Sequence, residues 1–209
     1  SLLLLRDITE LRMRDRLLVS KDATIREIHH RVKNNLQTIS SLLRLQGRRL
    51  ESTEAKLAID ESVRRIRAIA LVHETLANET TDDVSLSEVA EMLARTAQDS
   101  FTSPDRPIQF EVQGDAGLVP SDIVTPLAVV LNELLQNTVD HAFTREVSFI
   151  QGSAGLVEIL LDRTDKELKM AVRDNGVGVP EDFDSESQQG LGLSIIRGLV
   201  ITELSGSIE

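Results

Sequence analysis

The sequence predicts an α+β protein in two parts, a long antiparallel helical hairpin followed by a two-layer α/β sandwich. Apolar residues recur every three or four positions over the first third of the chain, whereas later segments mix short alternating strands with helices. The charge also changes sign. Residues 1–79 hold 15 Lys and Arg against 11 Asp and Glu, and residues 80–209 hold 8 against 23. A change of this size indicates two units with different roles.

The composition excludes several classes of protein. The 209 residues include no cysteine, which excludes disulfide frameworks and thiol catalysis and fits a reducing, cytoplasmic location. Aromatic residues make up 2% of the chain and the second part is acidic, so we expect no nucleic-acid partner. No apolar run approaches the roughly 20 residues of a membrane span, so we expect no membrane association.

The first part begins with residues 1–9, which we interpret as the end of a strand with a polar exit. Residues 10–79 form the expected hairpin, with one helix from about Glu10 to Arg49 and another from about Glu54 to Asn78. In both helices the apolar positions are three and four residues apart, which defines a continuous seam. Because a single hairpin exposes much apolar surface, we expect a homodimer in which two hairpins form a four-helix bundle.

Residues 80–84 are polar and acidic, and we predict a linker there that leads into the sandwich, residues 85–209. The segment Ser85-Leu-Ser-Glu88 is a capping box, which predicts a helix that ends near Ser100. A strand is expected next over Ile108–Val112, followed by a helix over Pro120–Ala142. A strand hairpin then spans Leu156–Leu161 and Leu168–Val172. An acidic loop over Pro180–Gln189 leads to a last helix over Leu191–Leu204. A final strand is expected to begin at Ser207.

Two adjacent histidines lie on the first helix, in the segment Arg26-Glu-Ile-His-His-Arg-Val-Lys-Asn-Asn-Leu-Gln37. Projected at about 100° per residue, His29 lies roughly 60° from the centre of the seam and His30 roughly 160° from it. His30 therefore faces solvent. The same face carries Lys33, Asn34 and Gln37. An exposed imidazole beside cationic and amide groups is suited to accept a phosphoryl group. The alternative is an ordinary polar face with a chance pair of histidines.

A polar stripe lies on the helix expected before residue 143. Glu133, Asn137 and His141 follow one another at intervals of four residues, so they share one side of a regular helix. Carboxylate and amide oxygens of this kind can hold a Mg²⁺ ion that also bridges phosphates. The alternative is a hydrogen-bonded polar face that binds no ligand.

Two glycine-containing segments complete the set of candidate sites. Asp174-Asn-Gly-Val-Gly178 directly follows a strand, where glycines allow the backbone to approach a ligand and the carboxylate can accept a hydrogen bond from an exocyclic amine. The alternative is a tight turn. Gly190-Leu-Gly-Leu193 opens the last helix, where free amides and the helix dipole favour phosphate. The alternative there is a flexible hinge.

Taken in order, these segments resemble the histidine kinases related to the HWE group. Residues 26–46 resemble the dimerisation and phosphoacceptor helix of those kinases. Residues 133–143, 174–178 and 190–193 resemble the N, G1 and G2 boxes of the GHKL ATP-binding fold. Residues 1–9 resemble the last strand of a PAS sensor domain.

The resemblance implies the dimeric sensor histidine kinase core of a two-component system, with ATP as substrate and Mg²⁺ as cofactor. It implies that His30 accepts the γ-phosphoryl group of ATP, which then passes to an aspartate of a response regulator. It also implies that Asn137 binds Mg²⁺, that Glu133 helps to position or activate, and that Asp174 reads adenine. The nucleotide pocket and its lid would be completed by His141, Gly176, Gly178, Gly190, Leu191, Gly192 and Leu193.

Several points depart from the family pattern or leave alternatives open. Arg31 stands where most sensor kinases have an acid, so the general base stays open between Glu27 and Asn34. His73-Glu74 on the second helix mimics the familiar His-Glu pair, but His73 falls on the seam and is interpreted as a core residue. The sequence ends before the Gly-Thr strand that usually closes the pocket, so we expect the C-terminal strand to be incomplete. The alternative functions are a GHKL ATPase and a catalytically inactive dimeric signalling scaffold.

Overall fold

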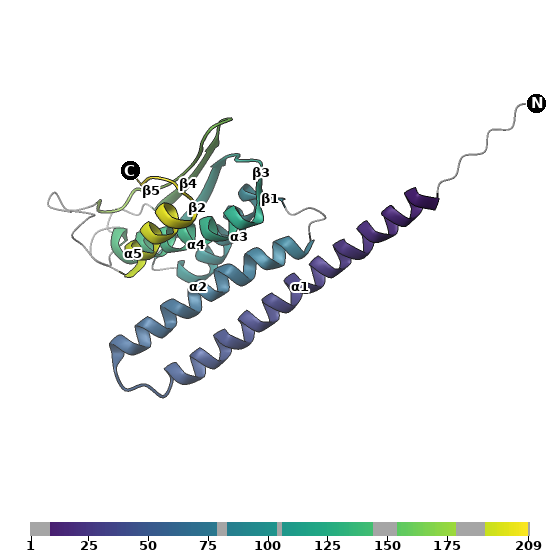
Figure 1. The fold of residues 1–209 in the computed structure, drawn as a ribbon. Coiled ribbons are helices and arrows are strands. Elements are labelled where there is room, and N and C mark those ends of the chain that lie inside the picture. Colours follow the sequence, from purple (N-terminus) through teal and green to yellow (C-terminus); the bar gives the residue numbers. More distant parts are fainter. Residues whose placement is uncertain (1–8, 79–82, 104–105, 144–153, 179–190, 209) are drawn as a thin grey trace, which may run out of the picture.

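The computed structural model describes residues 9–78, 83–103, 106–143, 154–178 and 191–208. Within these ranges the chain forms a helical hairpin and an α/β unit that packs against one helix of that hairpin (Figure 1). Three predicted features fall outside the described residues: the strand over residues 1–8, the acidic loop over residues 180–189, and Gly190.

The hairpin consists of α1 (Thr9–Gly47) and α2 (Thr53–Asn78). α2 packs along the C-terminal part of α1, whose N-terminal part projects beyond it (Figure 1). The side-chain hydroxyl of Ser52 caps the start of α2 by accepting a hydrogen bond from the Ala55 amide at 3.2 Å. Gly47 lets the end of α1 approach α2 closely, since a Cβ atom there would lie 3.1 Å from the Ile59 side chain. Both predicted helices are therefore present.

A short two-stranded sheet follows the hairpin. β1 (Asp83–Ser85) pairs antiparallel with β3 (Leu118–Pro120), with Val84 opposite Val119. Both valines are almost fully buried. The predicted linker over residues 80–84 therefore ends in a strand, because Asp83 and Val84 belong to β1. The sequence could not reveal this sheet, since three residues are too few to display an alternating pattern.

The first helix of the α/β unit is α3 (Leu86–Phe101). The predicted N-cap is present, because the Ser85 hydroxyl accepts a hydrogen bond from the Glu88 amide at 3.3 Å, which is the serine half of a capping box. The buried side chains of α3 recur at helical spacing and face the sheet. They are Leu86, Val89, Ala90, Leu93, Ala94 and Ala97.

The main sheet has three strands in the order β2 (Ile108–Gly114), β4 (Gly155–Arg163) and β5 (Leu168–Asp174). β2 runs parallel to β4, and β4 runs antiparallel to β5. Alternate residues of β4 are buried, including Val157 and Ile159. They belong to one core with the apolar side chains of α3 and α4, so these helices form the second layer of the sandwich (Figure 1).

Two helices position the candidate site. α4 (Ser121–Asn137) continues into a π-helical turn over Thr138–Ala142, and α5 (Leu191–Gly198) continues into another over Leu199–Glu203. After α5 the chain does not form the strand predicted from Ser207, because residues 205–208 have no strand pairing. They cap the helix instead: Ser205 has a φ of 51°, and the Gly206 amide donates to the Val200 carbonyl at 2.8 Å.

The hairpin meets the α/β unit through α2, which packs on α3 and α4. Ala68 and Val72 of α2 are buried in the same apolar core as α3, α4 and the sheet. Within the described part of the chain, every helix is too short or too polar to cross a lipid bilayer.

Candidate active site

The two adjacent histidines of α1 face different surroundings. His30 is exposed and has no hydrogen-bond partner among the described residues, whereas His29 is half-buried. The His29 Nδ1 atom lies 3.0 Å from the Nδ1 atom of His73, and the two ring centroids are 5.3 Å apart. The helical projection predicted this difference. His73 lies inside the hairpin, and burial, followed by the proximity of His29, lowers the pKa of its imidazole.

The polar residues around His30 are partly engaged with one another. Arg31 Nε donates to Glu27 Oε1 at 3.0 Å, so the carboxylate proposed as a general base is held by the cation that follows His30. Lys33 forms an ion pair with Glu74 of α2. The side chain of Asn34 is exposed, and its neutral amide can accept a hydrogen bond but not a proton.

The predicted stripe on α4 is only partly continuous. Glu133 is buried and Asn137 is half-buried. His141 lies in the π-helical turn and is exposed. A π-helical turn bonds each residue to the fifth one along instead of the fourth. The regular helix predicted through Ala142 therefore ends at Asn137, and His141 lies in a turn of different geometry.

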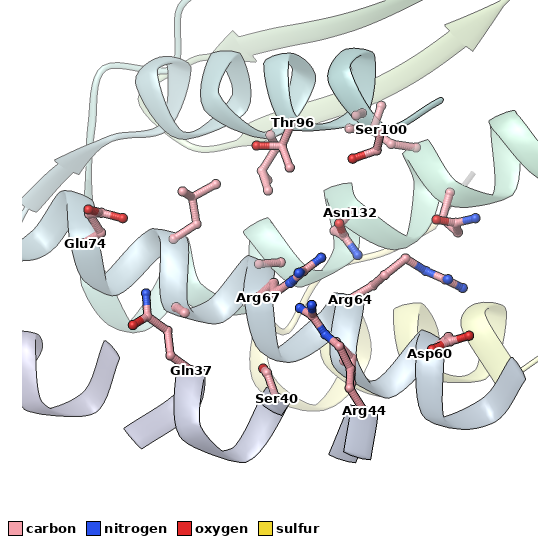
Figure 2. A pocket seen from close by; sticks show the side chains of 18 of the residues that line it. Gln37, Ser40, Arg44, Asp60, Arg64, Arg67, Glu74, Thr96, Ser100 and Asn132 are labelled. Carbon is pink, nitrogen blue, oxygen red and sulfur yellow. The ribbon is translucent and has the colours of Figure 1, made fainter. Parts of the chain in front are cut away.

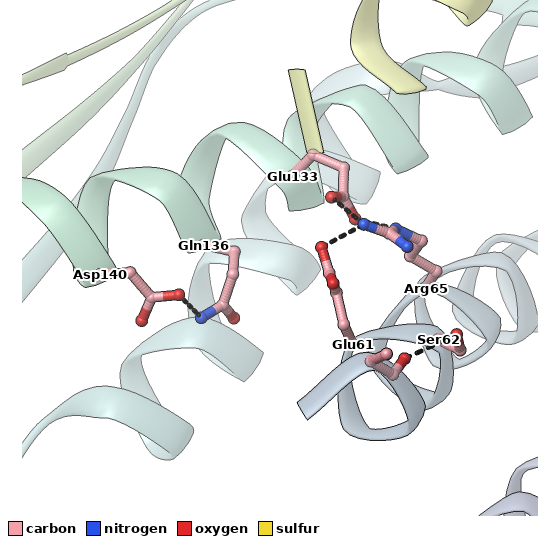
Figure 3. A network of polar contacts seen from close by, with 7 residues as sticks. Glu61, Ser62, Arg65, Glu133, Gln136 and Asp140 are labelled. Carbon is pink, nitrogen blue, oxygen red and sulfur yellow. Dashed lines mark hydrogen bonds and ion pairs between the residues drawn. The ribbon is translucent and has the colours of Figure 1, made fainter. Parts of the chain in front are cut away.

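Glu133 is held by an arginine of the hairpin. Arg65 of α2 donates from Nε to Glu133 Oε1 and from Nη2 to Glu133 Oε2, both at 2.8 Å (Figure 3). Arg65 also forms an ion pair with Glu61, one turn earlier on α2. The Glu133 side chain is 4% exposed and that of Arg65 is 13% exposed. Burial lowers the pKa of Arg65, but the hydrogen bonds and charges of the two carboxylates outweigh it and raise that pKa. We call the Arg65–Glu133 pair the clasp.

Gly192 brings the start of α5 against the stripe. A Cβ atom at this position would lie 3.1 Å from Glu133 Oε2 and 3.3 Å from Asn137 Oδ1. The glycine therefore allows a backbone approach that a side chain would obstruct. Leu193 follows it and is half-buried, while the side chain of Leu191 lies outside the described residues.

The Asp174 segment reaches the same end of α4. Asp174 ends β5, and its Oδ1 atom accepts a hydrogen bond from the Gly176 amide at 3.0 Å. The Val177 amide donates to the Ala142 carbonyl at 3.0 Å, and a Cβ atom at Gly176 would lie 2.4 Å from that oxygen. A Cβ atom at Gly178 would have nothing within 4 Å. This position favours glycine because its φ of 73° lies in the left-handed region, which other residues rarely adopt.

Two further contacts hold this arrangement in place. Arg106 donates to the Phe143 carbonyl at 2.8 Å and to the Val139 carbonyl, which satisfies the carbonyl groups at the end of α4. The Asn175 Oδ1 atom accepts a hydrogen bond from the Leu156 amide at 2.7 Å, which fixes the Asp174 segment to β4. The sequence reasoning did not identify either residue.

The structure therefore gathers three predicted segments around the C-terminal half of α4. They supply a carboxylate from Asp174, an amide from Asn137 and glycine backbone from Gly176 and Gly192, which suits a phosphate-containing ligand. Mg²⁺ keeps most of its water and phosphate ligands and needs only one or two protein oxygens. Asn137 Oδ1, beside Gly192, provides one such oxygen. No group of three or more His, Cys, Asp or Glu suited to a metal occurs in the described ranges.

A separate cleft of about 810 Å³ lies between the hairpin and the α/β unit (Figure 2). Its walls come from α1, α2, α3 and α4. They include Gln37, Ser40, Arg44, Arg64, Arg67, Thr96, Ser100 and Asn132. Neither Asn137 nor Asp174 lines it, so this cleft is distinct from the predicted nucleotide site.

Comparisons with known proteins identify two domains. The histidine kinase family model matches residues 27–101, and the model of the histidine kinase-, DNA gyrase B- and HSP90-like ATPases matches residues 123–209. The first match contains the predicted acceptor helix. The second contains the α4 stripe, the Asp174 segment and α5.

The chain is also similar to individual kinases. It is 47% identical to the sensor histidine kinase PdtaS of Mycobacterium tuberculosis over 99% of this chain and 40% of that protein. It is 45% identical to PdtaS of Mycolicibacterium smegmatis over 98% of this chain, again 40% of that protein. The solved histidine kinase domain of the Erythrobacter litoralis EL346 blue-light activated histidine kinase superposes with a TM-score of 0.58 and 27% identity, covering 90% of this chain and 84% of that one.

Proposed function

The chain belongs to the histidine kinases, and on that premise we propose that it catalyses its own phosphorylation on His30 at the expense of ATP. We further propose that the phosphoryl group passes to an aspartate of a response-regulator receiver domain. The chain spans 40% of the length of its PdtaS relatives, so the activity, substrates and partners of the whole protein are part of this proposal. We also propose the cytoplasm as the location, because ATP is available there.

One observation carries the proposal. A single chain presents an exposed imidazole on α1 and, in its α/β unit, three glycine- and amide-bearing segments gathered at the end of α4. The first is a nucleophile without a partner in the described ranges, and the second suits a nucleotide. Phosphoryl transfer needs these two parts to be brought together in line, since positioning and charge stabilisation supply most of the catalysis.

In the proposed transfer a ring nitrogen of His30 attacks the γ-phosphorus of ATP. A P–N bond forms, the P–O bond to ADP breaks, and the imidazole loses its proton. Of the two base candidates, Glu27 is the one able to take that proton, because the amide of Asn34 is not basic. Arg31, one helical turn after Glu27, holds the Glu27 carboxylate by a hydrogen bond. Asn34 is suited to orient the imidazole of His30 by a hydrogen bond.

The nucleotide site is assigned to the α/β unit. Asn137 Oδ1 would hold Mg²⁺, which supplies charge neutralisation at the phosphates when bound. Asp174 would accept the exocyclic amine of adenine. Gly192 keeps the backbone of α5 close to Asn137, and Gly176 keeps the Asp174 segment close to Ala142 at the end of the π-helical turn, because a Cβ atom at either position would meet those neighbours.

We propose a homodimer formed through the hairpins. Large apolar side chains of α1 and α2 remain exposed in a single chain. They are Ile28, Ile39, Leu42, Leu45 and Leu57. Burying such a row against its copy completes a four-helix bundle. The net positive charge of residues 1–79 also favours approach of an acidic receiver domain.

The test is autophosphorylation of the purified chain with γ-labelled ATP and Mg²⁺, with His30→Gln and His29→Gln compared at equal helicity. We expect acid-labile, base-stable label in the wild type and His29→Gln but not in His30→Gln. Label lost only in His29→Gln would move the acceptor to His29. Phosphate release that persists in His30→Gln without any protein label would indicate an ATPase. ATP binding with neither reaction would indicate a signalling scaffold.

A further inference from the structure

The clasp joins the two units of the molecule at Glu133, the residue that the family resemblance assigns to the nucleotide site. Glu133 lies on α4, beside Gly192 and one turn before Asn137, whereas Arg65 lies on α2 of the hairpin. Both Glu133 oxygens accept hydrogen bonds from Arg65, at 2.8 Å each. With its side chain 4% exposed, Glu133 has no oxygen directed to solvent. While the clasp is closed, this carboxylate can neither contact a magnesium-bound nucleotide nor accept a proton.

We propose that Arg65 is a positioning residue that holds the kinase in a resting arrangement, and that the clasp must open before phosphoryl transfer to His30. This inference rests on the proposed kinase function. The clasp adds to that function a contact by which the position of the hairpin controls the nucleotide site. Closing the clasp docks the α/β unit on α2 and occupies Glu133 in a single step.

Glu61 gives Arg65 a second partner on its own helix. Arg65 pairs with Glu61 at the i,i+4 spacing, so its charge stays compensated when Glu133 departs (Figure 3). Glu133, once released, still faces Asn137 and Gly192, where the cations that accompany a nucleotide would compensate it. Both charges thus have a partner in the closed and in the open arrangement. An exchange of this kind costs much less than leaving a buried charge unpaired.

The interface around the clasp is apolar on one side and unfilled on the other. Ala68 and Val72 of α2 are buried in the core shared with α3 and α4. On the other side a cleft of about 810 Å³ lies between α1, α2, α3 and α4 (Figure 2). Ser40 Oγ and Arg64 Nε, on helices that line this cleft, are buried without a hydrogen-bond partner in the described structure. Movement of the two units is therefore expected to begin on the cleft side, because polar contacts between units of one chain separate more readily than apolar ones.

The experiment compares Arg65→Gln with Arg64→Gln, a matched variant of the next residue on α2. Arg64 makes no ion pair within the described residues and does not contact the nucleotide site. At saturating MgATP we expect Arg65→Gln to raise the initial rate of autophosphorylation roughly 5-fold or more. This factor is the lower end of the usual effect of energetic coupling between two sites of one protein. Arg64→Gln should stay within about 2-fold of the wild type, because Arg64, although half-buried at the cleft, makes no ion pair with Glu133 in the described structure.

A second readout reports the docking itself. Because the chain has no cysteine, the pair Ser41→Cys and Ser100→Cys places spin labels on the hairpin and the α/β unit at two residues that line the cleft. We expect Arg65→Gln to lengthen and broaden the distance distribution between the labels, and Arg64→Gln to leave it unchanged. Arg65→Lys keeps the charge but loses the two-pronged geometry, so it should give an intermediate rate and distance.

Each outcome decides the matter. A reduced rate in Arg65→Gln with unchanged distances would overturn the proposal, because Arg65 would then hold Glu133 in its working position. If Arg65→Lys gave the same rate and the same label distances as the wild type, any positive charge at this position would suffice. That result would also overturn the proposal, which assigns the resting arrangement to the two hydrogen bonds of the arginine. If the wild type takes up no label, the kinase function fails, and the distance measurement alone decides whether the clasp controls docking. If Arg65→Gln loses helicity, the comparison of Arg65→Lys with the wild type carries the test.

Discussion

The hairpin and the α/β unit differ in how completely each buries its own apolar residues. In the α/β unit, side chains from two helices and the sheet form one core, in which Ile108, Leu131 and Ile159 are almost fully buried. In the hairpin, Leu42 and Leu57 are 57% and 62% exposed. The apolar core of the α/β unit is therefore buried within one chain, whereas the hairpin leaves apolar side chains exposed that the proposed dimer would cover. The proposed reaction lies between the two, with the acceptor on the hairpin and the nucleotide site on the α/β unit.

The largest expected effect tests the completeness of the α/β core. Phe143 is 1% exposed, and the ring packs so closely on β4 that a Cβ atom at Gly155 would lie 2.8 Å from it. Phe143→Ala should lower the free energy of unfolding by about 3–5 kcal/mol, because it leaves a cavity in a packed core. Denaturant unfolding followed by circular dichroism measures this. Ile39→Ala, at a hairpin residue that is 45% exposed in a single chain, is the comparison, made at protein concentrations below the dissociation constant of the proposed dimer. An equal loss there would contradict the contrast between the two parts.

The next effect tests the incompleteness of the hairpin. Leu42→Asp places a charge in the apolar row that we assign to the dimer interface. We expect it to weaken the dimer by about 3 kcal/mol or more, roughly 100-fold in Kd, because burial of the leucine is lost and a carboxylate must be desolvated. Sedimentation equilibrium gives the dissociation constant. Gln37→Asp, at an exposed position on the side of α1 that faces the cleft, is the control. A dimer unaffected by Leu42→Asp would place the interface elsewhere.

A smaller effect separates two glycines of α5. A Cβ atom at Gly192 would meet Glu133 and Asn137, whereas one at Gly198 has nothing within 4 Å. Gly192→Ala should weaken MgATP binding by about 1 kcal/mol, since neighbouring side chains must give way. Gly198→Ala should leave binding unchanged and stabilise the helix by up to about 1 kcal/mol. Calorimetric titration and thermal unfolding measure the two quantities. Equal ATP affinity in both variants would remove Gly192 from the nucleotide site.

The smallest effect concerns pH. Burial and the nearby His29 lower the pKa of His73 below its ordinary value of 6.5 in the folded chain. As the pH falls through about 6.5 the unfolded chain takes up this proton before the folded chain does, so stability decreases until the lowered pKa is reached. Above that window the neutral imidazole contributes no pH dependence.

His73→Gln should therefore reduce the dependence of the unfolding temperature on pH between about 7.5 and 5.5, a window around the ordinary histidine pKa. His30→Gln is the matched control, because that imidazole is exposed and lacks a partner within the described residues. It should retain the pH dependence of the wild type in thermal scans. An unchanged slope in His73→Gln would contradict the assigned burial of this histidine.

The sequence alone determined the features that depend on neighbours along the chain. Helical spacing predicted α1 and α2 and distinguished the exposed His30 from the inward His29. The Ser85 capping box predicted the start of α3, and strand alternation predicted the β4–β5 hairpin. These patterns can be read because residues within four positions on a helix, or two on a strand, determine which face each side chain occupies.

Only the tertiary structure decided the features that join distant segments. The β1–β3 pair joins residues 83–85 to residues 118–120, and the clasp joins Arg65 to Glu133, 68 positions away. No periodic pattern encodes such pairings, since each depends on where complete elements pack. Likewise, helical spacing did not reveal that the turn after Asn137, which carries His141, is π-helical. Local chemistry thus defined the candidate residues, while packing of α2 on α4 determined that Glu133 is held by the hairpin.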